Sequence, residues 1–401
     1  MKKIFCFLIF SFNIFYLCAQ DFKINYREIT KDDILVGAER TDQYFPLLKG
    51  KNIAIVANQT SMIKNTHLVD SLLHAGFSIK KIFSPEHGFR GNAEAGKKID
   101  DYTDKKTGLP VVSLYGKKKK PNSTDLKGID IIIFDIQDVG VRFFTYISTM
   151  HYMMEACAEN NITFLVLDRP NPNGFYIDGP VLDTTLKSFV GIHPVPIVHG
   201  MTLAEYACMI NGEEWLKNGI HCKLKYVTVS NYNHTYFYKI SVNPSPNLKN
   251  MNAIYLYPSL CLFEGTIVSV GRGTDKPFQV IGHPLVKDGN YSFTPVSIPS
   301  ECEEPPYKNV LCKGYEISTF GEVFIKNSRQ LYLYWLIGMY QQYPDKEKFF
   351  SLFFDKLAGT TALREQIIKG ESEENIRKSW QPGINKFKKI RKKYLLYPDF
   401  E

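Results

Sequence analysis

The stretch IIIFDIQDVGVRFFTY, residues 131–146, decides the fold. It opens with four apolar residues, a run too short for a helix and typical of a strand buried on both faces in a parallel sheet. Four charged or amide side chains then follow within eight residues: Asp135, Gln137, Asp138 and Arg142. Charged groups at the end of a buried strand are unfavourable unless they are paired or face a cleft. This strand end is therefore the first candidate for a functional site, and an Asp–Arg pair that only fixes the loop is the structural alternative.

Buried strands and helices alternate on both sides of this stretch. Short apolar runs predict strands at residues 53–57, 79–83, 111–114, 162–167 and 196–198. Helices are predicted at residues 66–75 and 146–159, and after Thr202, which forms a capping box with Glu205. The alternation is typical of a parallel sheet covered by helices, so the sequence predicts an α/β fold.

Five of the predicted strands end in polar or ionisable residues. These residues are Asn58, Glu86 with His87, Gln137 with Asp138, Asp168 with Arg169, and His199. In open parallel sheets the carboxyl ends of the strands share one edge, and ligands bind in the crevice outside it. The agreement of five strand ends predicts a site at that edge, although any single member can serve only to support its neighbours.

The length and the N-terminus indicate an exported protein of two domains. Lys2 and Lys3 precede an apolar run at residues 4–17, followed by small or polar residues, which is the layout of a cleaved secretory signal over residues 1–20. We therefore expect a periplasmic or extracellular protein. No later segment is long and apolar enough for stable membrane insertion. Because one core seldom holds the remaining chain, we expect domains at residues 21–250 and 251–401.

The second half of the chain has a different pattern. From Asn243 onward the strand–helix alternation stops, residues 253–256 suggest a strand, and amphipathic helices follow from about Gln330. Near the N-terminus, residues 30–39 suggest a polar helix. Cys302 and Cys312 flank a Pro-Pro loop and form the most plausible disulfide of an exported chain.

Charge and motifs exclude several function classes. The net charge falls from +8 to +6 when Lys2 and Lys3 are removed, and the basic runs lack interleaved aromatics, so we expect no nucleic-acid partner. Attraction to an anionic polymer stays open. No phosphate-binding glycine motif occurs, and we expect no cofactor. No GxSxG occurs, which argues against a serine hydrolase.

The strand-end residues can support sugar hydrolysis. Glu86, held between Pro85 and His87, is the candidate general acid, and its structural alternative is a partner for Arg90 or Arg142. Glycosidic cleavage typically uses two carboxyl groups, and Asp138 and Glu264 are the best second carboxylates, because both lie beside glycines next to apolar runs. Arginines can grip a substrate carboxylate, and the candidates are Arg142, Arg169 and Arg272. The spacing of His87, Asp138, Asp168 and His199 also permits a metal hydrolase but does not demand one.

Eight ordered blocks carry a family resemblance that covers almost all of the chain after about residue 50. The blocks are VANQTS (56–61), FSPEHGFRG (83–91), FDIQDVGVRFFTYISTM (134–150), LDRPNPNG (167–174), HGMTLAEYA (199–207), SPNL (245–248), YPSLCLFEGT (257–266) and SVGRGTDKPF (269–278). They resemble the NamZ family of exo-β-N-acetylmuramidases. The resemblance implies a Rossmann-like N-terminal domain, a smaller α/β (α+β) C-terminal domain and an active-site cleft between them.

The resemblance also implies a substrate and residue roles. Such enzymes release terminal N-acetylmuramic acid from the non-reducing end of peptidoglycan fragments, so muramyl saccharides are the expected partners. The family's PEHG glutamate falls on Glu86. The lactyl carboxylate of the sugar would explain the arginines. The expected substrate-binding residues are Asn58, His87, Gln137, Arg142, Tyr146, Asp168, Arg169, Asn171, His199 and Arg272.

Two points stay open on the sequence. The second catalytic group can be Asp138, Glu264, Tyr146 or the acetamide of the substrate itself. Two rival functions share the same cleft: a periplasmic binding protein for cell-wall sugars, which needs no acid, and a metal-dependent hydrolase that acts on wall fragments. The oligomeric state is not indicated.

Overall fold

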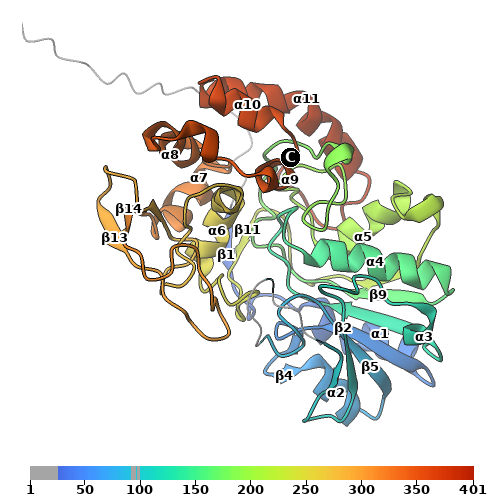
Figure 1. Ribbon diagram of the computed structural model, residues 1–401. Coiled ribbons are helices and arrows are strands. Elements are labelled where there is room, and N and C mark those ends of the chain that lie inside the picture. The colour runs from blue at the N-terminus through green and yellow to red at the C-terminus, as the bar shows by residue number, and fades with distance from the viewer. Residues whose placement is uncertain (1–25, 92–95, 97–99) are drawn as a thin grey trace, which may run out of the picture.

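The quoted stretch forms strand β8 (Ile131–Asp135), which lies inside a seven-stranded sheet in the computed structural model (Figure 1). The structure describes residues 26–91, 96 and 100–401, so the predicted signal sequence at 1–20 lies outside the described residues. The strands are β2 (Asn52–Ala57), β5 (Ser78–Ser84), β6 (Tyr102–Thr103), β7 (Pro110–Ser113), β8, β9 (Thr163–Leu167) and β10 (Lys223–Val227). Every residue of β8 is buried, as its apolar run predicts.

The strand order is that of a doubly wound sheet. It reads β10-β9-β8-β2-β5-β7-β6, and all neighbours are parallel except β6 and β7. From β2 the chain first builds outward through β5 and β7, and it then returns to build the other half from β8 through β9 and β10. The direction reverses between β2 and β8, where ligand crevices of such sheets lie. The predicted α/β, Rossmann-like fold is confirmed.

Helices cover both faces of this sheet because its strands alternate their side chains between two cores. Ala54, Val56, Ile132 and Phe134 face the core under α4 (Tyr146–Glu159) and α5 (Leu203–Gly212). The intervening residues face the core under α1 (Thr41–Leu48) and α2 (Leu68–His74). A hairpin of β3 (Met62–Ile63) and β4 (Thr66–His67) precedes α2, and α3 (Ser123–Leu126) precedes β8. These elements form the first lobe.

The second lobe contains a small antiparallel sheet and most of the later helices (Figure 1). Its sheet has the order β12-β14-β13, formed by β12 (Val280–His283), β13 (Tyr291–Phe293) and β14 (Cys312–Glu316). Its helices are α6 (Met251–Leu260), α7 (Lys326–Ser328), α8 (Tyr334–Gln342), α9 (Leu352–Ala358) and α10 (Ala362–Ile368). A parallel pair, β1 (Arg27–Ile29) with β11 (Tyr236–Tyr238), connects the start of the described chain to the first lobe.

The last helix, α11 (Glu373–Arg391), leads the chain back to the first lobe, and one hydrophobic core extends through both lobes. The domain boundary at residue 250 stays a prediction. None of the helices in the described ranges is long and apolar enough to cross a bilayer.

Three secondary-structure predictions are wrong. Residues 253–256 lie inside α6, whose first turn is capped by Asn250, because a fully buried helix and a buried strand show the same apolar run. Residues 30–39 contain no long helix, because Asp33 accepts hydrogen bonds from the backbone and hydroxyl of Thr30 and fixes a turn there. Residues 196–198 make only isolated bridges, through Val198, and are not a strand of the sheet.

The predicted disulfide is also wrong. Cys312 keeps its thiol, whose sulfur lies 3.8 Å from the carbonyl oxygen of Val310. Cys312 is buried in β14, whereas Cys302 lines the cavity described below. Sequence spacing alone does not bring two sulfurs into bonding geometry.

Candidate active site

A cavity of about 400 Å³ lies between the two lobes and receives five of the predicted site residues. Glu86, His87 and Tyr146 line it from the first lobe, and Glu264 and Arg272 line it from the second lobe. Apolar and aromatic side chains fill the wall between them, among them Phe143, Phe144, Tyr257 and Phe278. The cavity therefore combines an apolar wall with a few convergent polar groups, which is typical of small-molecule sites.

Glu86 is held at both carboxyl oxygens by groups on three different segments. Oε1 accepts a hydrogen bond from the backbone N–H of Gly96 at 2.9 Å, and Oε2 accepts one from the Thr145 hydroxyl at 2.7 Å. The hydroxyl of Tyr115 is a third partner, and its own pKa is raised by burial and by Glu86. Because a hydroxyl can donate or accept, Thr145 and Tyr115 can pair with both the ionised and the protonated carboxyl.

Two structural features fix the position of Glu86. The turn after β5 places His87 at φ +72°, a left-handed conformation that is uncommon for any residue other than glycine. Thr145 is the residue before α4, at the end of the quoted stretch. The loop between β8 and α4 thus brings the Thr145 hydroxyl to the carboxyl group of Glu86, which follows β5.

Tyr146 connects the cavity wall to the ends of the central strands. Its hydroxyl accepts a hydrogen bond from Asn58 Nδ2 at 2.9 Å and donates one to the carbonyl of Pro244 at 2.8 Å. Asn58 itself is fully buried, and its Oδ1 accepts from the backbone N–H and hydroxyl of Thr60. Asn58 therefore fixes the loop after β2 and reaches the cavity only through Tyr146.

Glu264 and Arg272 form an ion pair in the opposite wall. Arg272 Nε lies 2.5 Å from Glu264 Oε1, and the guanidinium carbon lies 4.9 Å from the ring centre of Phe278. Burial opposes the charge of Arg272, but the attraction of Glu264 outweighs it and raises the pKa of Arg272. The pairing through Nε leaves the two terminal nitrogens for another anion, since a guanidinium has five N–H donors.

Arg142 does not line the cavity. It is 2% exposed, and its two terminal nitrogens donate to four carbonyl oxygens, those of Pro180 and Val195 in the first lobe and Leu357 and Ala358 at the end of α9. Burial lowers its pKa to about 9. Arg142 joins the lobes, and the prediction that it grips a substrate carboxylate does not fit this geometry.

Arg169 and the predicted amides also serve the strand-end loops. Arg169 forms a two-pronged pair with Asp135, at 2.6 and 2.9 Å, so the Asp–Arg pair considered for this strand end exists with a different arginine. Gln137 donates to the carbonyls of Asp138 and Pro170. Asn171 donates to the carbonyl of Met201. All three residues are buried, and none of them lines the cavity.

The loop after β8 needs a glycine where it crosses the loop after β9. Gly140 has φ +76°, and a Cβ there would lie 2.0 Å from Asn171 Oδ1. The two strand-end loops are thus in contact through a position that only glycine can occupy.

Asp138 and His199 are buried and incompletely paired. Asp138 Oδ1 accepts from the N–H of Gly140 at 2.6 Å, whereas Oδ2 and His199 Nε2 have no hydrogen-bond partner among the described residues. Burial raises the pKa of Asp138 to about 7 and lowers the pKa of His199 to about 3. Neither side chain lines the cavity.

We expect Asp138→Asn to flatten the dependence of stability on pH. A folded-state pKa raised from about 3.9 to about 7 means that the folded chain keeps a proton that the unfolded chain has released. The stabilisation by that proton is complete below about pH 4 and is lost as the pH rises through 7. Urea unfolding at pH 4 and 8 should show the wild type losing about 2–4 kcal/mol relative to the variant. Parallel pH profiles would contradict a protonated Asp138.

The C-terminal segment contacts the residues that follow β9 and β10 through Arg391 and Tyr397. Asp168 Oδ2 accepts from the Tyr397 hydroxyl at 2.6 Å, and Oδ1 accepts from the N–H of Ala204 at the start of α5. Arg391 donates to the carbonyl of Gly200 and pairs with Asp399. Asp168 thus holds the C-terminal tail, residues 392–401, rather than facing the cavity. Burial raises its pKa to about 6.

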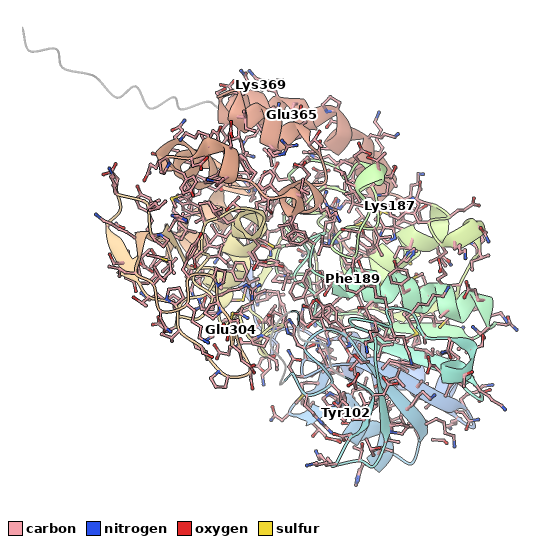
Figure 2. All side chains as sticks on the ribbon, in the orientation of Figure 1. Tyr102, Lys187, Phe189, Glu304, Glu365 and Lys369 are labelled. Atoms are coloured by element: carbon pink, nitrogen blue, oxygen red, sulfur yellow. The ribbon has the colours of Figure 1, made fainter. Side chains whose placement is uncertain are left out.

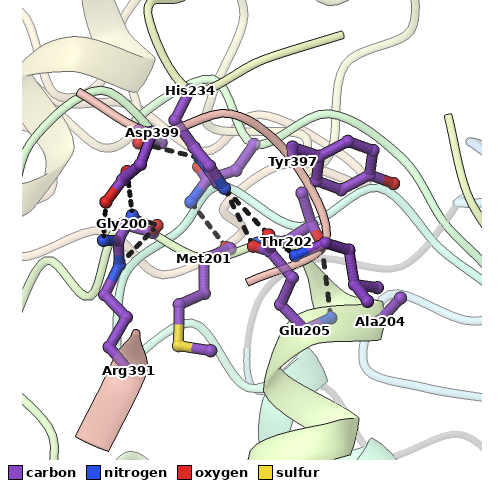
Figure 3. Close-up of polar contacts among 12 residues, drawn as sticks. Gly200, Met201, Thr202, Ala204, Glu205, His234, Arg391, Tyr397 and Asp399 are labelled. Atoms are coloured by element: carbon purple, nitrogen blue, oxygen red, sulfur yellow. Dashed lines mark hydrogen bonds and ion pairs between the residues drawn. The ribbon is translucent and has the colours of Figure 1, made fainter. Parts of the chain in front are cut away.

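A second buried pair fastens the same tail. His234 contacts both carboxyl oxygens of Glu205 at 3.0 Å, and Glu205 also accepts from the backbone N–H groups of Thr202 and Leu396 (Figure 3). The predicted capping box of α5 is confirmed, and the same glutamate binds the tail. Of the five polar clusters predicted at strand ends, only Glu86 with His87 lines the cavity.

The part of the chain that the structure describes contains no cluster of side chains that could bind a metal ion. There, no three His, Cys, Asp or Glu side chains come together as metal ligands. Of the four residues in the metal-hydrolase hypothesis, His87 lines the cavity, and Asp138, Asp168 and His199 do not.

Sequence reasoning missed Tyr115, Thr145 and Phe278. Tyr115 is the second residue after β7, and Thr145 lies inside the quoted stretch directly before α4, so their position at strand and helix ends was a usable signal. Phe278 has no such signal, because its contact with Arg272 depends on a turn of the loop between them.

Comparison with known proteins covers both lobes. A family model described as exo-beta-N-acetylmuramidase NamZ, N-terminal, matches residues 53–252, and its C-terminal counterpart matches residues 255–397. The chain is 41% identical over 375 residues to the peptidoglycan beta-N-acetylmuramidase NamZ of Bacillus subtilis (strain 168), which covers 88% of this chain and 89% of that protein.

Solved structures have the same fold. A DUF1343 family protein from Bacteroides fragilis NCTC 9343 superposes with a TM-score of 0.85 at 49% identity, over 91% of this chain and 99% of its own. A second DUF1343 family protein from the same strain has a TM-score of 0.74 at 30% identity, over 91% and 99% of the two chains.

Proposed function

The chain belongs to the NamZ family of exo-β-N-acetylmuramidases, and from this premise we propose that it is an exported glycoside hydrolase that releases terminal β-linked N-acetylmuramic acid from the non-reducing end of peptidoglycan fragments. The family resemblance carried by the eight sequence motifs is confirmed. Family membership makes the chain a glycoside hydrolase, and the substrate end, the linkage and the export are the proposed part.

One observation carries the proposal: Glu86 and Arg272 line the same cavity from opposite lobes. Glu86 is the proton donor to the leaving oxygen in this proposal, since its hydroxyl partners fit both protonation states. Arg272 is the receptor for the lactyl carboxylate, because Glu264 and Phe278 fix its guanidinium while two terminal nitrogens stay available. A muramyl sugar is the hexosamine that needs both groups.

The test is an assay of residues 21–401 with a chromogenic β-N-acetylmuramide and the matching β-N-acetylglucosaminide, each with and without chelator. Release from the muramide alone, unaffected by chelator, is the expected result. Tight binding of the sugar without release would favour the binding-protein alternative. Loss of activity with chelator would favour the metal-dependent hydrolase.

We propose that the substrate's own acetamide assists the reaction. Glu264 is engaged by Arg272, and the Tyr146 hydroxyl already has both a donor and an acceptor partner. Asp138 lies outside the cavity lining. Some glycosidases use the neighbouring acetamide in place of a second enzyme group. An N-trifluoroacetyl substrate should then react at least about tenfold more slowly, whereas an unchanged rate would return the role to an enzyme group.

We expect Glu264→Gln to weaken substrate binding more than turnover. Removing the charge that holds Arg272 leaves the guanidinium less well placed for the lactyl carboxylate, so KM for the muramide should rise about tenfold, which is about 1.4 kcal/mol. Steady-state kinetics on the muramide and the glucosaminide measure the effect. A fall in kcat of a thousandfold with unchanged KM would make Glu264 a catalytic group instead.

Export rests on residues 1–20, which precede the described chain. Expression with and without this segment, followed by cell fractionation, should place only the longer form outside the cytoplasm. Equal distribution of the two forms would overturn this part of the proposal.

A further inference from the structure

A series of side-chain contacts connects Glu86 with the surface of the first lobe. Tyr115 shares a hydrogen bond with Glu86, and its ring centre lies 5.9 Å from that of Phe189. The ammonium of Lys119 lies 4.8 Å from the centre of the Phe189 ring. Val190, the neighbour of Phe189, lines the cavity. Figure 2 shows Phe189 on the first-lobe side of the space between the lobes, with Glu304 of the second lobe on the other side.

The lysine run that follows Tyr115 is only partly neutralised. Lys118 pairs with Asp101 and Asp125, and Lys120 pairs with Glu155 and Glu159. Lys117 and Lys119 are exposed, and neither forms an ion pair with any residue that the structure describes. The aromatic ring of Phe189, rather than a carboxylate, holds the Lys119 ammonium, so its charge stays available to an anion.

The position of Glu86 indicates which part of the substrate would lie along Tyr115 and Phe189. A general acid protonates the oxygen that joins the released sugar to the rest of the substrate, so the leaving saccharide must begin beside Glu86. Arg272 belongs to the second lobe and takes the carboxylate of the released sugar. The leaving saccharide then extends along the first-lobe side, past Tyr115 and Phe189.

We propose that Lys119, held over Phe189, binds a carboxylate on the leaving saccharide and gives the enzyme a preference for longer anionic glycans. This inference rests on the proposed function. In a strand in which muramyl and glucosamine units alternate, the first leaving sugar is neutral and the second carries the next lactyl carboxylate. Tyr115 and Phe189 would line the neutral unit, and Lys119 would meet the charged one. Phe189 and Lys119 lie outside the lining of the cavity that would hold the released sugar.

The experiment compares three substrates and three variants. The substrates are an aryl muramide, the disaccharide of N-acetylmuramic acid with N-acetylglucosamine, and the trisaccharide that ends in a second N-acetylmuramic acid. Lys119→Ala should lower kcat/KM for the trisaccharide about three- to fivefold at low salt, as expected for an exposed ion pair, and the loss should shrink as salt is added. Phe189→Leu should lower kcat/KM for the disaccharide and the trisaccharide, which share the neutral unit, and leave the aryl muramide unaffected.

Lys118→Ala is the matched control, because the neighbouring ammonium is already paired with two carboxylates. It should behave like the wild type on all three substrates. When the carboxylate of the second N-acetylmuramic acid is amidated, kcat/KM for the trisaccharide should be the same for Lys119→Ala and the wild type. Equal losses on all three substrates, or no loss on the trisaccharide, would overturn the proposal. Failure of the wild type on every muramide would instead reject the proposed function.

Discussion

Glu86→Gln is expected to lower the turnover of the muramyl disaccharide by about a thousandfold, within the range of about 10²–10⁴ that a positioned general acid contributes. The amide keeps the shape of the side chain: its oxygen can still accept from the Gly96 N–H, and its NH2 group can donate to the Thr145 hydroxyl, so the cavity should keep its form. The amide has no acidic proton that it could transfer to the leaving oxygen. Binding should persist, so the loss should appear in kcat while KM changes little.

The leaving group provides the control for this variant. An aryl muramide with an acidic phenol leaves without a proton, so Glu86→Gln should retain most of its activity on that substrate. Rates on the disaccharide and on a series of phenols of falling pKa measure the difference. Near-normal turnover of the disaccharide by the variant, or an equal loss on every leaving group, would contradict the role of Glu86 as proton donor.

Arg142→Met is expected to destabilise the protein by about 4 kcal/mol or more. The guanidinium donates to four buried carbonyl oxygens on two lobes, and each buried polar group left without a partner costs about 1–3 kcal/mol. Methionine fills the space but donates nothing. Denaturant unfolding of variant and wild type measures the difference.

Arg142→Lys is the matched comparison, because one ammonium has three donors and cannot serve four carbonyls. It should lie between wild type and Arg142→Met in stability. Because Arg142 is enclosed, the folded fraction of either variant should keep the preference for muramide over glucosaminide. A stable Arg142→Met with lost preference would restore the substrate role that the sequence suggested.

The sequence was sufficient for most of the sheet and for the position of Glu86 at the end of a strand. Apolar runs located β2, β5, β8 and β9, because strands buried on both faces leave an unbroken apolar pattern, whereas β10, as long as β8 but mostly exposed, was not predicted. The helix at residues 146–159 was predicted with its observed bounds. Glu86 was found because it follows a strand, and strand position is a local property of the chain.

The roles of the other strand-end residues could not be read from the sequence. Asn58, Gln137, Asp168 and Arg169 all follow strands, as predicted, but their partners lie up to 229 residues away, as in the bond between Asp168 and Tyr397. A polar side chain at a strand end looks the same whether it faces a ligand or a loop of its own chain. Only the tertiary contacts separate these cases.

The different roles of Arg142 and Arg272 also depend on tertiary contacts that the sequence does not show. Arg142 and Arg272 occur in similar glycine-rich motifs, and both could bind a carboxylate. Carbonyl oxygens from both lobes surround the first, and a glutamate with an aromatic ring orients the second toward the cavity. The sequence gives the chemical type of each group and not its surroundings.

The anchoring of the C-terminal tail has a consequence for the order in which the protein acquires its structure. Tyr397 and Arg391 complete the ends of β9 and β10, so the first lobe needs the last ten or so residues of the chain before its polar edge is satisfied. Contacts of such long sequence separation form late and slowly. Truncation before Tyr397 should therefore leave an open, aggregation-prone lobe. The first lobe thus depends for its completion on residues that follow the whole second lobe in the sequence.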